Sequence, residues 1–480
     1  MPRRTKIVAT LGPATDPSAI MDDIINAGVD VVRLNLSHDS HDRHRERANR
    51  IRERALAIGR EVALLMDLQG PKIRIGQFAG GRIELSPGDR FAIDLACGIN
   101  EGDQTQVGTT YTRLAEDVQP GDTLLLDDGA IELLVESVAN SRIDCQVIVG
   151  GPLSNNKGIN KKGGGLSAPA LTEKDKEDIR FAAEIDADYL AVSFVRNAED
   201  VRLARELFRA AGGHGGIVAK IERAEALNVI DDIINASDAI MVARGDLGVE
   251  IGDAELPAVQ KHLISRARAL NSVVITATQM MQSMIEHPIP TRAEVFDVAN
   301  AVLDGTDAVM LSAESSIGQY PAKVVEALDR ICLEAEKNVT RSGHRLDSVF
   351  GRVDEAIAMA AMYTANHLGV KAIAALTETG STVKWMSRIS SGIPIYAITR
   401  FAPTRRKVRL FRGAYPIAFD VSSTDIHEVN YEVIEELLRR GTVRDGDLVI
   451  VTKGDRSGVE GQTNIMKIMR VGEHRVLNED

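Results

Sequence analysis

Charged and polar residues stand at the ends of short apolar segments along much of this chain. The segment AIMVA at 239–243 is followed directly by Arg244, Gly245 and Asp246. Another segment, GIVAKIE at 216–222, carries Lys220 and Glu222 near its end. A solvated turn or a surface ion pair would explain each group by itself. Repetition at several segment ends favours a shared site instead.

Further segments carry residues of the same kinds at or just after their ends: Arg33, Asn35, Ser37 and His38 at 31–38; Asp67, Lys72 and Arg74 at 67–74; Ser193 in 189–194; and Thr278 in 273–279. Two carboxylates can share a hard divalent cation of the Mg²⁺ type, which keeps several waters and takes substrate oxygens. A metal site made of two carboxylates lacks the His and Cys ligands that zinc prefers. Arginines and lysines can neutralise a phosphoryl group during its transfer. A glycine at a helix start lets backbone N–H groups approach a substrate carboxylate.

The elements that must position these residues alternate along the chain. Apolar segments rich in β-branched residues lie at 6–10, 31–35, 62–67, 189–194, 216–222, 239–246, 273–279 and 308–314, with helical segments between them. Thr172 with Asp175, and Thr291 with Glu294, have capping-box spacing. Continuous apolar strands between helices are typical of parallel strands buried on both faces. Eight of them predict a closed (β/α)₈ TIM barrel, with an open doubly wound sheet as the alternative.

Two other regions have different patterns. Residues 71–165 contain alternating strands with Pro-Gly-Asp and Asp-Asp-Gly turns and no segment of helical period, which predicts an inserted, small all-β lid domain. From 346 onward, helices and strands alternate again, which predicts a C-terminal open α/β domain. We therefore expect barrel segments at 1–70 and 166–345, a lid at 71–165 and an α/β domain at 346–480.

Composition limits the classes of function. The 480 residues have a net charge of −12, which argues against nucleic-acid and anionic-membrane partners. The spacing of the three cysteines, Cys97, Cys145 and Cys332, does not match that of metal-binding motifs, which predicts reduced thiols. No signal peptide or membrane-length apolar run is present in the sequence. A cytoplasmic protein is expected.

Several motifs, taken in order, resemble those of the pyruvate kinase family. They are RLNLSH, DLQGPKIR, NNKGIN, VAKIERAEA, MVARGDLGVEI, ITATQMMQSMI and PTRAEVFDVANAVLDGTDAVMLSAE. The resemblance runs the whole chain and is most specific over 273–314; it is greatest to the bacterial form activated by sugar monophosphates or AMP. It implies phosphoryl transfer from phosphoenolpyruvate to ADP, giving pyruvate and ATP in the last step of glycolysis. It also implies Mg²⁺, with Mn²⁺ as a substitute, and a homotetramer.

The resemblance also implies roles for individual residues. Glu222 and Asp246 match the Mg²⁺ ligands, and Lys220, Thr278, Arg33 and Arg74 match catalytic positions. The substrate-binding positions are Arg33, Ser193, Ala243, Arg244, Gly245, Asp246 and Thr278. Nucleotide contacts are Asn35, His38, Arg74 and Lys157, and the monovalent-cation site corresponds to Asn35, Ser37, Asp67 and Lys72.

Two other functions remain as alternatives. A barrel lyase or aldolase that forms a pyruvate enolate on Mg²⁺ needs the same carboxylates, but no nucleotide-side arginine and no lid. A metabolite sensor could keep the fold without catalysis, although intact Lys220, Glu222, Asp246 and Thr278 argue against it. An ADP requirement for pyruvate release, and a coupled assay, separate these possibilities.

Two departures from the family pattern concern ions and regulation. K⁺-dependent members carry Glu at Lys72 and Thr at Leu68, so we expect that K⁺ is not required here. The loop TETGST matches the family's effector-phosphate loop, and Glu378 within it should repel a doubly phosphorylated sugar. A phosphorylated effector with one phosphate is therefore expected. Its binding residues would be Thr377, Thr379, Ser381, Thr382, Lys453 and Arg456.

Overall fold

Eight parallel strands form the closed barrel that the sequence predicts. In the computed structural model, which describes residues 2–338, 350–421, 426–454 and 463–473, the ring runs β1-β16-β15-β14-β13-β12-β3-β2. The strands are β1 Lys6–Thr10, β2 Val31–Asn35, β3 Ala63–Asp67, β12 Tyr189–Val192, β13 Gly216–Ile221, β14 Ala239–Ala243, β15 Val273–Ala277 and β16 Ala308–Leu311. Closure excludes the open doubly wound sheet.

Helices cover the outside of this barrel. They are α1 Ser18–Ala27, α2 His41–Ile58, α4 Glu173–Glu184, α5 Ala198–Ala210, α6 Ile230–Ala236, α8 Leu256–Ala269, α9 Arg292–Asp304 and α11 Pro321–Glu336. Both predicted capping boxes form, at Thr172 with Asp175 and at Thr291 with Glu294. Short helices α7 Arg244–Ile251 and α10 Ala313–Ser316 follow β14 and β16. Almost every strand residue is buried, because helices pack on one face of the ring and side chains fill its interior.

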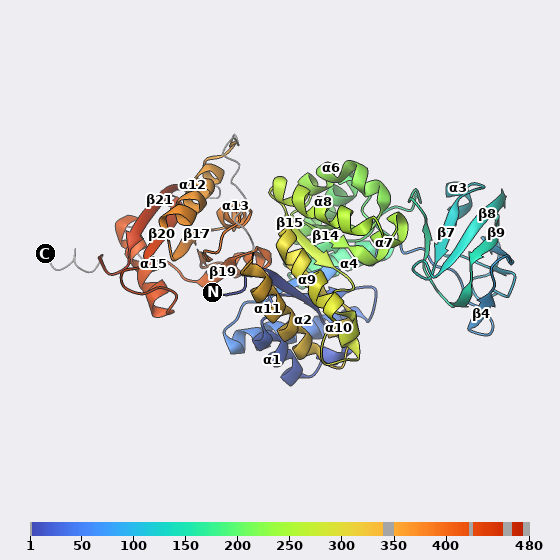
Figure 1. The fold of residues 1–480 in the computed structure, drawn as a ribbon, viewed down its shortest axis with the longest axis horizontal. Helices are drawn as coiled ribbons and strands as arrows, with labels where there is room; N and C mark the ends of the chain where they lie inside the picture. Colours follow the sequence, from blue (N-terminus) through green and yellow to red (C-terminus); the bar gives the residue numbers. More distant parts are fainter. Residues whose placement is uncertain (1, 339–349, 422–425, 455–462, 474–480) are drawn as a thin grey trace.

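A β domain lies between β3 and β12 in the chain, at the right of Figure 1. Its strands are β4 Arg82–Leu85, β5 Arg90–Asp94, β6 Gln106–Val107, β7 Thr123–Leu126, β8 Ile131–Ala139, β9 Arg142–Val149, β10 Gly151–Ser154 and β11 Ile159–Lys161. Six form one sheet, β11-β7-β8-β9-β5-β6, and β10 pairs with β4. The domain also contains one short helix, α3 Leu114–Asp117, of about a single turn.

The C-terminal domain lies at the opposite end of the barrel from the β domain (Figure 1). Its sheet has the order β19-β18-β17-β20-β21. The strands are β17 Ala372–Leu376, β18 Ile395–Thr399, β19 Ala414–Ala418, β20 Leu448–Gly454 and β21 Thr463–Arg470, the last antiparallel to β20. The helices are α12 Val353–Leu368, α13 Ser381–Ser387, α14 Ala402–Lys407 and α15 Ile426–Arg439.

Aspartates at the starts of barrel strands hold the C-terminal domain in place. Asp30 precedes β2 and pairs with Arg409 at 2.6 Å. Asp188 precedes β12, and its Oδ1 accepts a hydrogen bond from Arg406 Nε at 2.8 Å. Asp307 precedes β16 and pairs with Arg388. The C-terminal domain therefore covers the N-terminal strand ends and leaves the C-terminal ends to the β-domain side.

Candidate active site

Lys220 is the centre of a charged cluster at the C-terminal strand ends. It is the penultimate residue of β13, and its Nζ lies 2.9 Å from Glu222 Oε1 and 3.3 Å from Asp67 Oδ1. The same ammonium donates a hydrogen bond of 2.6 Å to Ser193 Oγ. Burial by itself would lower the pKa of Lys220, but Asp67 and Glu222 outweigh burial and raise it to about 12. The ammonium therefore stays charged throughout the physiological range.

Arg33 joins this cluster from β2 through the carboxylate of Asp67. Its Nε donates to Asp67 Oδ2 at 2.6 Å, and its Nη1 donates to Thr10 Oγ1 at 3.0 Å. Asp67 is fully buried, and burial would raise its pKa; Lys220 and Arg33 reverse that effect and lower it. A permanently ionised Asp67 thus holds two cationic side chains side by side.

Glu222 and Asp246 are the carboxylates suited to a divalent cation. Glu222 follows β13, is only 2% exposed, and accepts a hydrogen bond of 2.7 Å from the backbone N–H of Phe194. Burial raises the pKa of Glu222. The positive charge of Lys220 lowers this pKa, whereas the negative charge of Asp246 raises it further. A divalent cation would relieve this cost. No group of three or more His, Cys, Asp or Glu side chains suited to a metal occurs in the described parts of the chain.

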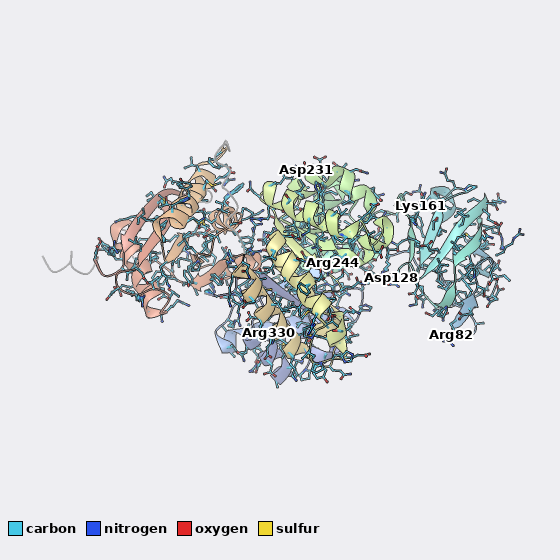
Figure 2. All side chains as sticks on the ribbon, in the orientation of Figure 1. Arg82, Asp128, Lys161, Asp231, Arg244 and Arg330 are labelled. Atoms are coloured by element: carbon cyan, nitrogen blue, oxygen red, sulfur yellow. The ribbon has the colours of Figure 1, made fainter. Side chains whose placement is uncertain are left out.

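Lys72 contacts the second of these carboxylates. Its Nζ lies 3.2 Å from Asp246 Oδ1 and 3.9 Å from Asp128 Oδ1. Lys72 follows β3, whereas Asp128 belongs to the β domain, on its barrel-facing side in Figure 2. A fixed positive charge therefore stands beside the candidate metal ligand, at the junction of barrel and β domain.

The start of α7 is the segment predicted to form a backbone cradle for a substrate carboxylate. Gly245 N donates to Thr278 Oγ1 at 2.8 Å, and that hydroxyl donates to the carbonyl of Ala277 at 2.6 Å. Thr278 has a left-handed φ of 65°, an unfavourable conformation for a β-branched residue that is typical of functional sites. The Arg244 guanidinium instead pairs with Asp297 at 2.7 Å. Arg244 therefore anchors α7 to α9 through its side chain, and Figure 2 labels it within the barrel.

The expected nucleotide residues are divided between barrel and β domain. In the β domain, Lys157 pairs with Asp127 at 2.7 Å. Arg74, in the segment between β3 and β4, donates to the carbonyl of Asn156 at 3.0 Å. At the barrel end of β2, Asn35 Oδ1 accepts from Ser37 N at 3.2 Å, and the carbonyl of His38 contacts His44 Nε2 at 2.7 Å. Within the described residues, no hydrogen bond joins Lys157 to the Lys220 cluster.

The expected effector loop lies between β17 and α13. Thr377 Oγ1 accepts from Gly380 N at 2.9 Å, and Ser381 Oγ lies 3.4 Å from Asp354 Oδ2. Thr382 is buried, with its hydroxyl 2.8 Å from Thr463 Oγ1. Lys453, in β20, is buried, Thr379 is partly buried, and Arg456 lies outside the described residues.

Thr10 and Asp128 are candidate functional residues that sequence reasoning missed. Thr10 is the last residue of β1, so the rule of reading strand ends applies to it as to the other strands. Asp128 sits in the Asp-Asp-Gly turn of the β domain, where the local sequence indicates only a turn. Its position near Lys72 depends on how the two domains pack.

A closed barrel with a charged cluster at the C-terminal ends of its strands defines the class of barrel enzymes. The family model described as "Pyruvate kinase, barrel domain" matches residues 2–325, and "Pyruvate kinase, alpha/beta domain" matches 355–469. The chain belongs to the pyruvate kinase family and is a phosphotransferase.

Relatives of nearly full length carry the same family name. "Pyruvate kinase II" of Salmonella typhimurium is 57% identical over 475 residues, which cover 98% of this chain and 99% of the relative. The pyruvate kinase of Haemophilus influenzae is 54% identical over 476 residues, covering 98% and 99%. That of Mycobacterium tuberculosis is 42% identical over 477 residues, covering 99% and 100%. Separately, no helix in the described ranges has the length and apolarity needed to span a membrane.

Proposed function

We propose that the Lys220 cluster is where the phosphoryl group of phosphoenolpyruvate passes to ADP. The observation that carries this proposal is the position of Lys220, 2.9 Å from Glu222 and 2.6 Å from Ser193 at the C-terminal ends of barrel strands. An ammonium held this way can neutralise charge on a phosphoryl group in transfer, and Arg33 can share that task. Ser193 and Asp67 are positioning residues, because they hold the ammonium and the guanidinium.

In this proposal, Glu222 and Asp246 bind Mg²⁺, with Mn²⁺ as a substitute. The ion supplies charge neutralisation and orientation of phosphoryl oxygens. The cradle at Gly245 holds the substrate's carboxylate by backbone N–H groups, and the Thr278 hydroxyl, bonded to Gly245 N, lies on the proton route to the pyruvate enolate. Arg74, Asn35, His38 and Lys157 contact the nucleotide, and closure of the β domain excludes water.

An Asp246→Asn variant tests this assignment. It should raise the Mg²⁺ concentration needed for half-maximal activity and lower turnover by roughly a hundredfold or more, because a charged ligand becomes neutral. Asp253→Asn, an exposed carboxylate just after α7, is the matched control and should behave like the unmodified enzyme. Near-normal turnover with unchanged Mg²⁺ dependence in Asp246→Asn would remove the metal assignment. Pyruvate release without ADP would instead support the lyase alternative.

The proposed enzyme does not require K⁺. The contact between Lys72 Nζ and Asp246 Oδ1 at 3.2 Å supports this, because the ammonium brings one positive charge to the site. Leu68 supplies no hydroxyl ligand, while Asn35, Ser37 and Asp67 keep the other positions of the cation site. Strong activation by K⁺ at constant ionic strength would contradict this proposal.

The proposed regulator is a phosphorylated metabolite with one phosphate, bound at the loop from Thr377 to Thr382. Glu378 in the loop and Asp354, 3.4 Å from Ser381 Oγ, both disfavour a second phosphate. The effector should lower the half-saturating phosphoenolpyruvate concentration more than it raises the maximal rate. Ser381→Asp tests the site without disturbing buried Thr382. If that variant responds fully, or if fructose bisphosphate activates the unmodified enzyme more strongly than glucose 6-phosphate, ribose 5-phosphate or AMP, the proposal fails.

The proposed assembly is a homotetramer, as the family implies. Two large apolar side chains near α9, Ile289 and Phe296, are 72% and 70% exposed in the single chain. Burying each in a subunit interface would stabilise it by about 1.5–3 kcal/mol. Light scattering should give four chains per particle, and Phe296→Glu should give smaller particles. A monomer in the unmodified protein would contradict this proposal.

A further inference from the structure

A cavity of about 230 Å³ lies between the barrel and the C-terminal domain, away from the Lys220 cluster. Four of its lining residues are arginines: Arg4, Arg268, Arg388 and Arg412. The one carboxylate in the lining is Asp307, which precedes β16 at the N-terminal end of the barrel. The phosphoryl-transfer chemistry uses none of these residues.

Two of these arginines are neutralised by partners in the protein. Arg388 makes a bidentate ion pair with Asp307, in which Arg388 Nη1 lies 2.7 Å from Asp307 Oδ2. Arg4 pairs with Glu336 at 3.4 Å and donates to the carbonyl of Ser391 at 2.6 Å. Asp307 and Glu336 are therefore already engaged.

Arg268 and Arg412 keep their charge without a carboxylate partner. Among the residues described, no carboxylate oxygen lies within ion-pair distance, 4.0 Å, of the guanidinium nitrogens of Arg268 or Arg412. Arg268 Nη2 donates to Ser390 Oγ at 2.8 Å, and Arg412 Nη1 donates to the carbonyl of Thr306 at 2.6 Å. Burial lowers the pKa of both guanidinium groups, that of Arg412 to about 10. An anion in the cavity would offset this cost.

The backbone beside Arg268 makes room for its side chain. Gly305 lines the cavity with a φ of 97°, and a Cβ at this position would overlap the Arg268 guanidinium. Leu303, Met362 and Ile393 are apolar residues of the lining. The cavity thus joins a cationic end to an apolar surface, a combination typical of small-molecule sites.

We propose that this cavity binds the phosphate monoester of a small metabolite through Arg268 and Arg412. A phosphate monoester carries close to two negative charges at neutral pH, which matches the two guanidinium charges that lack acidic partners. A carboxylate would supply only one. Guanidinium groups also bind phosphate oxygens in pairs. The volume is below that of pockets for drug-sized ligands, which excludes a dinucleotide.

The bound phosphate would connect two parts of the fold. Arg268 belongs to α8 of the barrel, whereas Arg412 precedes β19 of the C-terminal domain. Ser387, which lines the cavity, ends α13, and Ser381 of the proposed effector loop begins that helix. The cavity is therefore a second anion site at the other end of the same helix, and its ligand would stabilise one arrangement of the two domains.

Calorimetric titration tests the site in the full-length protein. The probes are inorganic phosphate, glycerol 3-phosphate and ribose 5-phosphate, with glycerol as the uncharged control, all in the Ser381→Asp background so that the effector loop does not contribute. At least one phosphate probe should bind with a Kd below about 10 mM. Arg268→Gln and Arg412→Gln should each weaken it roughly tenfold or more, whereas Arg266→Gln, on α8 but paired with Asp231, should not. No binding by any probe, or equal binding by all variants, would overturn the proposal.

Chemical modification gives a second measurement that needs no cavity variant. Phenylglyoxal modifies accessible arginines, and the modified peptides can be quantified by mass spectrometry. The probe that binds most tightly should slow modification of Arg268 and Arg412 and leave Arg266 unchanged. Equal modification rates with and without the probe would also overturn the proposal.

Discussion

Replacing Lys72 with glutamine should make the enzyme dependent on added K⁺. The side chain keeps a similar length but loses the ammonium that lies 3.2 Å from Asp246 Oδ1. The site around Asp246 and the phosphoryl group then has one positive charge fewer. A K⁺ ion among Asn35, Ser37 and Asp67 would restore that charge.

The Coulomb energy at this distance sets the size of the effect. Two unit charges 3.2 Å apart interact by about 5 kcal/mol at an effective dielectric of 20 and by about 1.3 kcal/mol in bulk water. Lys72 and Asp246 are 27% and 22% exposed, so an intermediate value of about 2–3 kcal/mol applies. That value corresponds to a roughly 30- to 150-fold loss of turnover without K⁺.

The assay compares KCl with tetramethylammonium chloride at equal ionic strength, with saturating Mg²⁺ and both substrates. The unmodified enzyme should have the same turnover in both salts, whereas Lys72→Gln should recover most of its loss in KCl. The double variant Leu68→Thr, Lys72→Glu should recover further, and Lys162→Gln, an exposed lysine of the β domain, is the control. Full turnover of Lys72→Gln without K⁺ would refute the reasoning.

Three further predictions follow from contacts outside the cation site. Ser193→Ala removes the 2.6 Å hydrogen bond to Lys220 Nζ and should lower kcat by roughly tenfold, measured by steady-state kinetics; an unchanged kcat would show that Lys220 needs no such support. Arg388→Met leaves buried Asp307 without its partner and should cost about 3–5 kcal/mol in urea denaturation, and a loss under about 1 kcal/mol would contradict it. Burial raises the pKa of Glu250 from 4.5 to about 7, so the folded protein holds the proton more tightly, and the free energy of unfolding should fall by up to about 3 kcal/mol as pH rises through this window. Glu250→Gln should remove that share of the pH dependence between about pH 4.5 and 7, and an identical slope in the variant would rule Glu250 out.

Much of the barrel follows from local pattern. Eight apolar segments of strand length, separated by helices with capping residues such as Thr172 and Thr291, are found as eight strands of one ring. Parallel strands place all their C-terminal ends on one side, so Glu222 and Asp246 had to share that side once the strands were recognised. The boundaries were less accurate, since the segment assigned to 239–246 ends as a strand at Ala243 and continues as helix α7.

The sequence by itself determined the strand and helix pattern, the side of the barrel on which the candidate site residues lie, and the family of the enzyme. Only the tertiary structure decided where individual side chains point: Arg244 pairs with Asp297, Lys72 contacts Asp246, and Arg268 and Arg412 line one cavity at a domain junction. The physical reason is the separation of the interacting residues along the sequence. Hydrophobic periodicity and helix caps involve residues only a few positions apart, so they can be recognised in the sequence. Ion pairs and cavities join residues far apart in sequence and depend on how whole elements pack.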